Sequence, residues 1–332
     1  MALQSDPSTI LAAFSLAPIS FLATYATMPW LIGALKKTRI TAPDLHKPRR
    51  PPVPRMGGIA IFVGFATAMT FSALLGLDYR LLFAIFLSGT LALLAGLIDD
   101  LFELGKAAVI CSTFLVSMPI VAFQAGSTLV YLTPFGPADL GWSFWLLVPF
   151  AFAFTMNGVN VYAGFNGLEA GLGVVSSFSL AICAIMYGSL ESAVALFALS
   201  GALLSFLKWN WCPARVFIGN SGTMLLGAVL ASSIIAGSIK IVGVVVFIPY
   251  LINFLLRARD RFNSTVAEVQ LLQKGNLKKS HLTALWAIFI RRTPMKEPRL
   301  VTRCILTQVA FCTAAIVLAF YHVNFILPHL RG

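Results

Sequence analysis

LLFAIFLSGTLALLAGLIDD, residues 81–100, is a run of eighteen residues without a charged side chain that ends in two aspartates. A helix of about 20 mostly apolar residues crosses the hydrocarbon core of a membrane. A carboxylate at the centre of such a helix would cost roughly 2.5–3.5 kcal/mol, and the cost is smaller at the helix end. The run therefore predicts a membrane-spanning helix whose two carboxylates lie at a membrane surface.

The composition extends this prediction to the whole chain. Of the 332 residues, 58% are hydrophobic and 11% are charged, and the mean hydropathy is +0.87. Soluble domains carry roughly 25% charged residues. Because the chain lacks the charged groups needed to cover its surface in water, soluble, fibrous and disordered proteins are excluded, and we expect the membrane bilayer to surround it.

Ten apolar runs are long enough to cross a membrane. We predict an all-α, polytopic membrane protein that forms a single domain over residues 1–332, with about ten transmembrane helices. The predicted spans are 10–34, 57–77, 81–98, 107–125, 142–160, 167–187, 190–207, 216–238, 240–256 and 301–326. The segment 281–292, HLTALWAIFIRR, is too short to cross and is predicted to form a helix at the membrane interface.

Basic residues are distributed unevenly over the loops between these spans. Of the 24 Lys and Arg residues, 20 fall in the loops 35–56, 99–106, 208–215 and 257–300, which alternation of the spans puts on one side. Basic residues collect on the cytoplasmic side of membrane proteins. We therefore predict that these loops are cytoplasmic, that both termini are non-cytoplasmic, and that the net charge of +12 reports orientation and not a nucleic-acid partner.

Polar side chains gather at the predicted cytoplasmic ends of the spans, so any active site is expected on that face. Asp99 and Asp100 close one span, and Lys106 follows them. Neighbouring carboxylates can steer a cation or accept a proton, and an ammonium group can hold a phosphate as a point charge. A solvated helix end would explain the same residues without a function.

The loop NGVNVYAGFNGLEAG, residues 157–171, brings several side-chain amides between two spans. Asn157 and Asn160 lie one helical turn apart and share a face, while Gly164 permits a tight turn before Asn166. Such a loop suits a planar, polar ligand that approaches the backbone. Each Asn alone could equally be a cap or turn residue.

Two further motifs occur on the same face. Gly219 and Asn220 stand at the start of an apolar run, where backbone N–H groups can bind an anion and side-chain oxygens can bind a metal; helix packing by small residues is the alternative. Arg257 and Arg259 open the longest loop and would point the same way in an extended segment. They could grip a diphosphate or contact anionic lipid headgroups.

Taken in order along the chain, these motifs resemble the polyprenyl-phosphate N-acetylhexosamine-1-phosphate transferase superfamily. The resemblance covers about residues 44–320 and includes DLHKPRRPPVPRMGG, LIDD, NVYAGFNGLEAG, NWCPARVFIGN and HLTALW. The form NGVN followed by AGFNGLEAG is similar to the eukaryotic and archaeal branch. Its members are the UDP-GlcNAc–dolichyl-phosphate GlcNAc-1-phosphotransferases that tunicamycin inhibits.

The resemblance implies an enzyme that transfers a sugar-1-phosphate, GlcNAc-1-phosphate in the first instance, from a UDP-sugar to a polyprenyl (dolichyl-type) phosphate and releases UMP. This reaction is the first membrane step of lipid-linked glycan synthesis for protein N-glycosylation. The resemblance implies Mg²⁺ as the cofactor, with Mn²⁺ as a substitute. It is compatible with a homodimer, and it favours an archaeal cell membrane over the endoplasmic reticulum.

The resemblance also implies roles for particular residues. Asp99 and Asp100 match the catalytic acidic pair, and Asn160 and Asn220 match the metal ligands. The substrate-binding positions are Leu45, Lys106, Gly164, Asn166, Glu169, Phe217, Arg257 and Arg259. The chain departs from the family twice: Asn220 stands where the family has Asp, which removes a negative charge from the metal site. Ala258 stands where the eukaryotic enzymes have a His that touches the sugar, which leaves the identity of the transferred sugar open.

Two other functions fit part of the pattern. Ten spans would also suit a secondary transporter or a lipid-sugar flippase, but transporters place polar residues near mid-membrane in corresponding halves of the chain. Here the polar residues lie at the cytoplasmic ends. Asn220 keeps open a third function, that of a catalytically weak relative that only binds nucleotide-sugar or lipid.

Overall fold

The computed structural model describes residues 7–132, 136–262, 269–272, 275–279 and 281–326. Within these residues nine helices are long and apolar enough to cross a membrane, and α4, with 17 residues, is a shorter tenth member of the bundle. The bundle consists of α1 (Pro7–Lys37), α2 (Gly58–Ser72), α3 (Tyr79–Phe102), α4 (Lys106–Ala122), α5 (Ser143–Val161), α6 (Leu168–Met186), α7 (Leu190–Asn210), α8 (Gly219–Ala236), α9 (Lys240–Arg259) and α11 (Glu297–Tyr321). Each predicted span overlaps one of these helices, so the prediction of an all-α membrane protein is confirmed.

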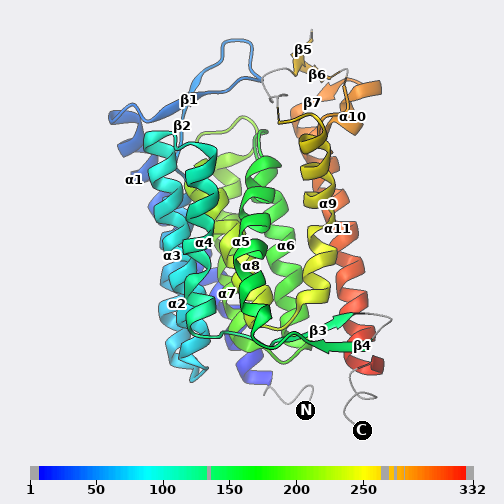
Figure 1. Ribbon diagram of the computed structural model, residues 1–332. Helices are drawn as coiled ribbons and strands as arrows, with labels where there is room; N and C mark the ends of the chain where they lie inside the picture. Colours follow the sequence, from blue (N-terminus) through cyan, green and yellow to red (C-terminus); the bar gives the residue numbers. More distant parts are fainter. Residues whose placement is uncertain (1–6, 133–135, 263–268, 273–274, 280, 327–332) are drawn as a thin grey trace.

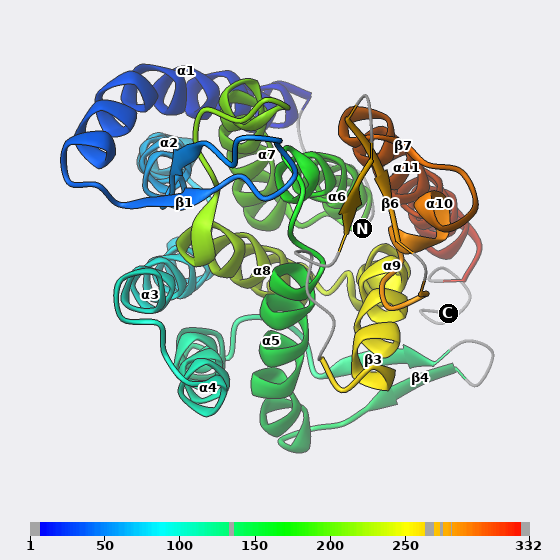
Figure 2. The ribbon, with the colours of Figure 1, turned by 90° about the horizontal axis from the view of Figure 1, so that it is seen from above.

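Helix α8 forms the centre of the bundle, and the other helices surround it (Figure 2). Its sequence is rich in Gly, Ala and Ser, and nearly all of its side chains are buried. Small residues allow helix backbones to approach closely within a membrane. A Cβ atom at Gly96 of α3 would lie only 2.5 Å from the backbone oxygen of Asn220. This close approach brings the end of α3 against the first turn of α8.

Short strands close the two ends of the bundle (Figure 1). At one end lie the pair β1 (Thr41–Pro43) and β2 (Pro52–Pro54), the three-stranded sheet of β5 (Gln270–Leu271), β6 (Asn276–Lys278) and β7 (Met295–Lys296), and the helix α10 (Ala287–Arg292). We call this the basic end, because it carries the basic loops. The hairpin of β3 (Leu129–Leu132) and β4 (Gly136–Asp139) lies at the opposite end. The sequence predicted none of these strands.

An even number of membrane crossings puts the two ends of a chain on the same side of the membrane. Helix α1 begins, and α11 ends, at the end opposite the basic end (Figure 1). Helix α2 continues into a 3-10 turn over Ala73–Leu75, and α11 continues into a short π-helix over His322–Ile326. The two ends of the described chain are therefore on the same side of the bundle.

The prediction of an interfacial helix over residues 281–292 was wrong in extent. Only Ala287–Arg292 is helical, as α10. Trp286 is 1% exposed, and its ring meets that of Phe165 edge to face at 5.0 Å. The apolar side chains of this segment pack onto the loop after α5, because burying an aromatic ring against protein satisfies the same hydrophobic drive as burying it in lipid.

Candidate active site

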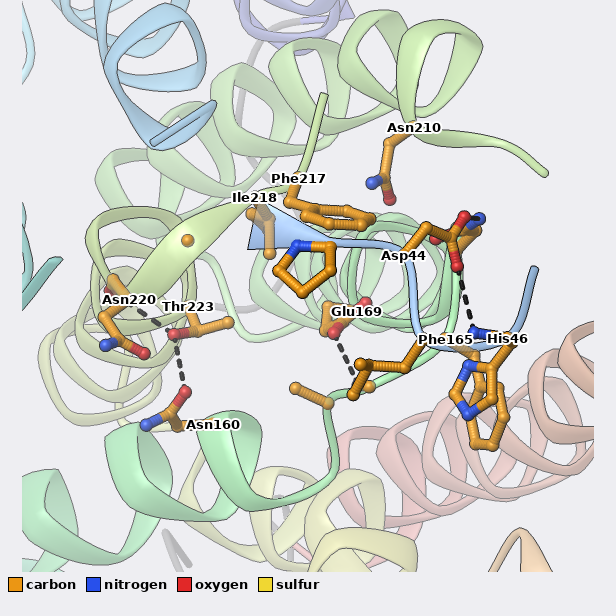
Figure 3. Close-up of a pocket in the computed structure, with 16 residues that line it drawn as sticks. Asp44, His46, Asn160, Phe165, Glu169, Asn210, Phe217, Ile218, Asn220 and Thr223 are labelled. Carbon is orange, nitrogen blue, oxygen red and sulfur yellow. Dashed lines mark hydrogen bonds between the residues drawn. The ribbon is translucent and has the colours of Figure 1, made fainter. Parts of the chain in front are cut away.

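A cavity of about 260 Å³ lies at the basic end of the bundle, between β1, the loop after α5 and the start of α8. Seven of the twelve site residues predicted from the sequence line it: Leu45, Asn160, Gly164, Asn166, Glu169, Phe217 and Asn220. The other five, Asp99, Asp100, Lys106, Arg257 and Arg259, do not line it. Figure 3 shows the amides of Asn160 and Asn220 on one side of the cavity and Asp44 with His46 on the other, with Phe217 between them.

The two amides predicted as metal ligands come together around one hydroxyl group. Thr223 Oγ1 donates a hydrogen bond to Asn160 Oδ1 at 3.1 Å and lies 3.3 Å from the backbone oxygen of Asn220 (Figure 3). Asn160 is the second-last residue of α5, and Asn220 is the second residue of α8. Residues 60 positions apart in the sequence therefore present neutral oxygen and N–H groups to the same side of the cavity.

The loop between α5 and α6 is held in its turn by hydrogen bonds to its own backbone. Glu169 Oε1 accepts a hydrogen bond from the N–H of Gly164 at 2.8 Å. Asn210 Oδ1, at the end of α7, accepts one from the N–H of Gly167 at 3.0 Å. Gly167 has a φ of 86°, a left-handed conformation in which glycine pays no steric cost. Glu169 lines the cavity, but its carboxylate is engaged in shaping this loop.

Asp100 does not line the cavity but binds the backbone of Asn220, which does. Its Oδ1 accepts a hydrogen bond from the N–H of Asn220 at 2.9 Å, and its Oδ2 accepts one from the N–H of Ser221 at 3.0 Å. The N–H groups in the first turn of a helix have no acceptor within the helix, so they need one from outside it, and they favour a negatively charged acceptor. Gly219, with a φ of 73°, leaves room for the carboxylate, since a Cβ there would lie 2.6 Å from Asp100 Oδ2.

Asp99 also makes a backbone contact. Its Oδ1 accepts a hydrogen bond from the N–H of Leu104 at 2.9 Å, which stabilises the turn between α3 and α4. Arg55, from the segment after β2, donates to the backbone oxygen of Asp100. The acidic pair predicted to be catalytic thus joins α3, α4 and α8 at the basic end, and its carboxylates lie outside the cavity wall.

The three predicted phosphate-binding cations lie at helix ends and do not line the cavity. Lys106 is the first residue of α4, and Arg257 and Arg259 lie in the last turn of α9. The expectation that the two arginines point the same way in an extended segment was wrong, because α9 stays helical through Arg259. Residues two apart in a helix point about 200° apart. Arg257 is half-buried, and Arg259 is exposed.

The sequence did not single out a buried ionic cluster that borders the cavity. Lys47 donates a hydrogen bond to Glu297 Oε2, and its Nζ lies 3.6 Å from Asp44 Oδ2. Partial burial alone would lower the pKa of Lys47, but the hydrogen bond and charge of Glu297, with the charge of Asp44, raise it above its usual value. Asp44 and Lys47 belong to the quoted motif DLHKPRR, which was a usable signal. No sequence signal pointed to Glu297, because it lies far along the chain, at the start of α11.

Glu297 also reaches the loop that carries Asn166. Its Oε1 accepts a hydrogen bond from the N–H of Asn166 at 2.8 Å. Cys212 Sγ lies 3.5 Å from Glu297 Oε2, and burial, followed by the nearby charge of Glu297, raises the pKa of that thiol. The cluster therefore ties the last helix to three loops at the basic end.

The donor chemistry of the cavity suits a hard divalent cation in part. Mg²⁺ prefers oxygen ligands and is commonly held by one or two carboxylates together with substrate phosphates. Asn160 and Asn220 offer amide oxygens without charge, and the cavity's carboxylates on Asp44 and Glu169 already accept hydrogen bonds. Among the described residues, no three His, Cys, Asp or Glu side chains gather as a metal site. The residues fit a cation whose charge is balanced by the phosphates of a ligand.

The fold and the cavity define an integral membrane protein with a polar ligand site at one end of its helical bundle. The profile of glycosyl transferase family 4 matches residues 82–238. A relative from Saccharolobus solfataricus, provisionally named a UDP-N-acetylglucosamine–dolichyl-phosphate N-acetylglucosaminephosphotransferase, is 33% identical over 249 residues, which cover 74% of this chain and 77% of the relative. A relative from Sulfolobus acidocaldarius with the same provisional name is 31% identical over 254 residues, 74% of this chain and 77% of the relative.

A bacterial relative extends the comparison. The decaprenyl-phosphate N-acetylglucosaminephosphotransferase of Mycobacterium tuberculosis is 30% identical over 252 residues, 70% of this chain and 59% of the relative. The chain belongs to glycosyl transferase family 4, within the polyprenyl-phosphate sugar-1-phosphate transferases that its motifs resemble. The family predicted from the sequence is confirmed.

Proposed function

We propose that the protein is a glycosyl-1-phosphate transferase that moves GlcNAc-1-phosphate from a UDP-sugar to a dolichyl-type polyprenyl phosphate and releases UMP. The observation that carries the proposal is the single cavity lined by Leu45, Gly164, Asn166 and Phe217 together with Asn160 and Asn220. At about 260 Å³ the cavity is smaller than the roughly 300–1,000 Å³ of typical ligand pockets. It therefore receives the nucleoside end of the UDP-sugar, and the sugar and the lipid lie beyond it.

The two sides of the cavity suit the two ends of a nucleoside diphosphate. The aromatic face of Phe217 and the amide of Asn166 suit a planar base, because aromatic rings stack and amides form directed hydrogen bonds. The amides of Asn160 and Asn220 on the other side would then meet the phosphates. Lys106, Arg257 and Arg259 at the surrounding helix ends would bind the phosphates of the sugar donor and of the lipid.

The reaction depends more on positioning the two substrates than on proton transfer. An oxygen of the lipid phosphate attacks the β-phosphorus of the UDP-sugar, and the bond from that phosphorus to the bridging oxygen breaks, so that this oxygen leaves with UMP. A phosphate monoester has a second pKa of about 6 and is mostly a dianion at pH 7, so it can attack without a strong base. Both oxygens of Asp100 are already hydrogen-bonded, and we assign this carboxylate to holding Asn220 in place.

A metal ion would add one contribution. A Mg²⁺ or Mn²⁺ held by Asn160 and Asn220 would supply Lewis-acid neutralisation of the diphosphate. Because both ligands are uncharged amides, we expect the chain to bind the ion weakly without nucleotide and more tightly with it. The positioned N–H groups and cations of the chain stabilise the charge that develops on the transferred phosphorus.

We place the cavity on the cytoplasmic side of an archaeal cell membrane, with both termini outside. The support is the charge distribution, since 20 of the 24 basic residues fall in the loops of the basic end. Archaeal relatives with the dolichyl-phosphate name support the choice of lipid. A homodimer stays a prediction from the family resemblance.

One experiment separates this function from a flippase and from a binding protein without activity. The purified chain is incubated with UDP-GlcNAc labelled in the sugar, Mg²⁺ and a dolichyl phosphate, and both UMP and labelled lipid are measured. The proposal expects the two products in equal amounts. Nucleotide binding without products would favour the inactive relative. Transport of a lipid-linked sugar across vesicles without UMP release would favour the flippase.

A further inference from the structure

The orientation of one side-chain amide in the cavity is fixed by a buried carboxylate. Asn166 Nδ2 donates a hydrogen bond to Asp44 Oδ2 at 2.9 Å. Asp44 is 3% exposed and Asn166 is 4% exposed, so water competes little with this contact. Asp44 Oδ1 is engaged as well, because it accepts a hydrogen bond from the N–H of His46 at 3.3 Å.

The chemistry of the pair leaves one arrangement open to the amide. An ionised carboxylate can only accept hydrogen bonds, so the NH₂ group of Asn166, and not its oxygen, must face Asp44. Asn166 lines the cavity, and among the described residues nothing donates to its Oδ1. This oxygen is therefore the acceptor that Asn166 offers to a ligand.

A second layer of contacts holds the carboxylate in place. Lys47 Nζ lies 3.6 Å from Asp44 Oδ2 and is itself bound to Glu297. Glu297 in turn accepts the backbone N–H of Asn166 at 2.8 Å. The carboxylate of Asp44 and the backbone of Asn166 are thus both in contact with the same Lys47–Glu297 pair.

We propose that Asp44 fixes Asn166 Oδ1 as a hydrogen-bond acceptor in the cavity and so selects a pyrimidine base with an N–H donor at N3. Uracil carries that donor, whereas N3 of cytosine is an acceptor and would face the amide oxygen without a proton between them. Asp44 is a specificity-determining, positioning residue that acts through Asn166. The inference deepens the proposed function and rests on its nucleotide site.

The first measurement uses the unaltered chain and three nucleoside monophosphates of equal charge: UMP, CMP and 3-methyl-UMP, which lacks the N3 proton. Their dissociation constants are measured by calorimetry on the full chain in lipid nanodiscs. One buried hydrogen-bonding group left unpaired weakens binding by about 5- to 100-fold. We expect CMP and 3-methyl-UMP to bind more weakly than UMP by a factor in this range.

The second measurement tests the part played by Asp44. Asp44→Ala leaves the amide of Asn166 free to turn over, so the ratio of the CMP to the UMP dissociation constant should fall to within about 3-fold of unity, since the single fixed contact is lost. The double variant Asp44→Asn with Asn166→Asp exchanges donor and acceptor. There the NH₂ of residue 44 faces a carboxylate at position 166, whose other oxygen still accepts from N3, so the ratio should return to 5-fold or more.

A matched control and the contrary results complete the design. Asp139→Ala removes a carboxylate that accepts from Thr128 and Gly141 in the hairpin at the opposite end of the bundle, and it should leave the ratio unchanged. General damage to the site would weaken UMP and CMP together and keep their ratio.

The inference is overturned if the unaltered chain binds CMP or 3-methyl-UMP as tightly as UMP, or binds no UMP. It is also overturned if Asp44→Ala keeps the full ratio, or if the double variant does not restore it. The wild-type arm with 3-methyl-UMP decides the matter even if Asp44→Ala does not fold. Selective UMP binding without sugar transfer would refute the proposed function and leave this inference standing.

Discussion

Replacement of Asp100 by Asn separates support of the cavity from chemistry. The carboxylate accepts the N–H groups of Asn220 and Ser221 at 2.9 and 3.0 Å, and Asp100 is 2% exposed. An Asn side chain has one acceptor oxygen, so its NH₂ group would face one of the two N–H groups. A buried N–H without a partner costs about 1–3 kcal/mol, and loss of a negative charge at a helix N-terminus costs about 0.3–1 kcal/mol more. We therefore expect Asp100→Asn to lower the free energy of unfolding by about 1.3–4 kcal/mol.

Asp99→Asn is the matched control for this change. Within the described part of the chain, Asp99 accepts a single side-chain hydrogen bond, from the N–H of Leu104 to Oδ1, and an Asn oxygen can keep that contact. Asp99 also lies at the C-terminal end of α3, where a negative charge opposes the helix dipole. The control should therefore change the free energy of unfolding by less than about 1 kcal/mol.

The assay is a denaturant titration of each variant in mixed micelles, with sugar transfer measured on the same preparations. We expect Asp100→Asn to stay folded under native conditions but to lose transfer, because the first turn of α8 carries Asn220. Equal losses of stability for the two variants would refute the assignment of Asp100 as the cap of α8. Full transfer activity in Asp100→Asn would remove this carboxylate from the mechanism altogether.

Three further changes test other parts of the account. Asn220→Asp restores a charged ligand, so it should tighten Mn²⁺ binding measured by electron paramagnetic resonance without nucleotide and raise turnover; unchanged Mn²⁺ affinity would place the metal elsewhere. Gly219→Ala places an alanine in a left-handed backbone conformation, which costs about 1–2 kcal/mol, and puts a Cβ 2.6 Å from the carboxylate that caps α8. The free energy of unfolding and the rate of transfer should therefore both fall; wild-type values of the two would contradict the geometry. In a Cys111→Ser, Cys212→Ser background, which removes the two cysteines that are not buried, Thr38→Cys should react with an impermeant maleimide only from the cytoplasmic side and Ser143→Cys only from outside; reversed labelling would invert the proposed orientation.

The spanning helices could be predicted from the sequence because length and apolarity alone decide them. Each of the ten runs became a helix, with ends that moved by a few residues where polar side chains extend the helix, as in α9. The prediction that Arg257 and Arg259 are extended failed for this reason, since α9 continues through both. Local sequence does not show how far a helix continues beyond the edge of the lipid.

The site was predictable residue by residue but not in its connections. Seven predicted residues line one cavity because the loops that carry them all end at the same face. The capping of α8 by Asp100 requires α3 and α8 to pack side by side, and the contact of Glu297 with Asn166 joins residues 131 positions apart. Such contacts depend on tertiary packing that no local motif encodes, so the sequence does not predict that Glu297 reaches Asn166, although Lys47 lies within a recognisable motif.

The central claim is that phosphorus moves together with the sugar. It is tested most directly with two preparations of UDP-GlcNAc, one labelled with ³²P at the α-phosphate and the other at the β-phosphate, each given to the purified chain with dolichyl phosphate and Mg²⁺. The account predicts that the β-label enters the lipid fraction and that the α-label leaves as UMP. Release of both labels as UDP, with only the sugar on the lipid, would contradict it.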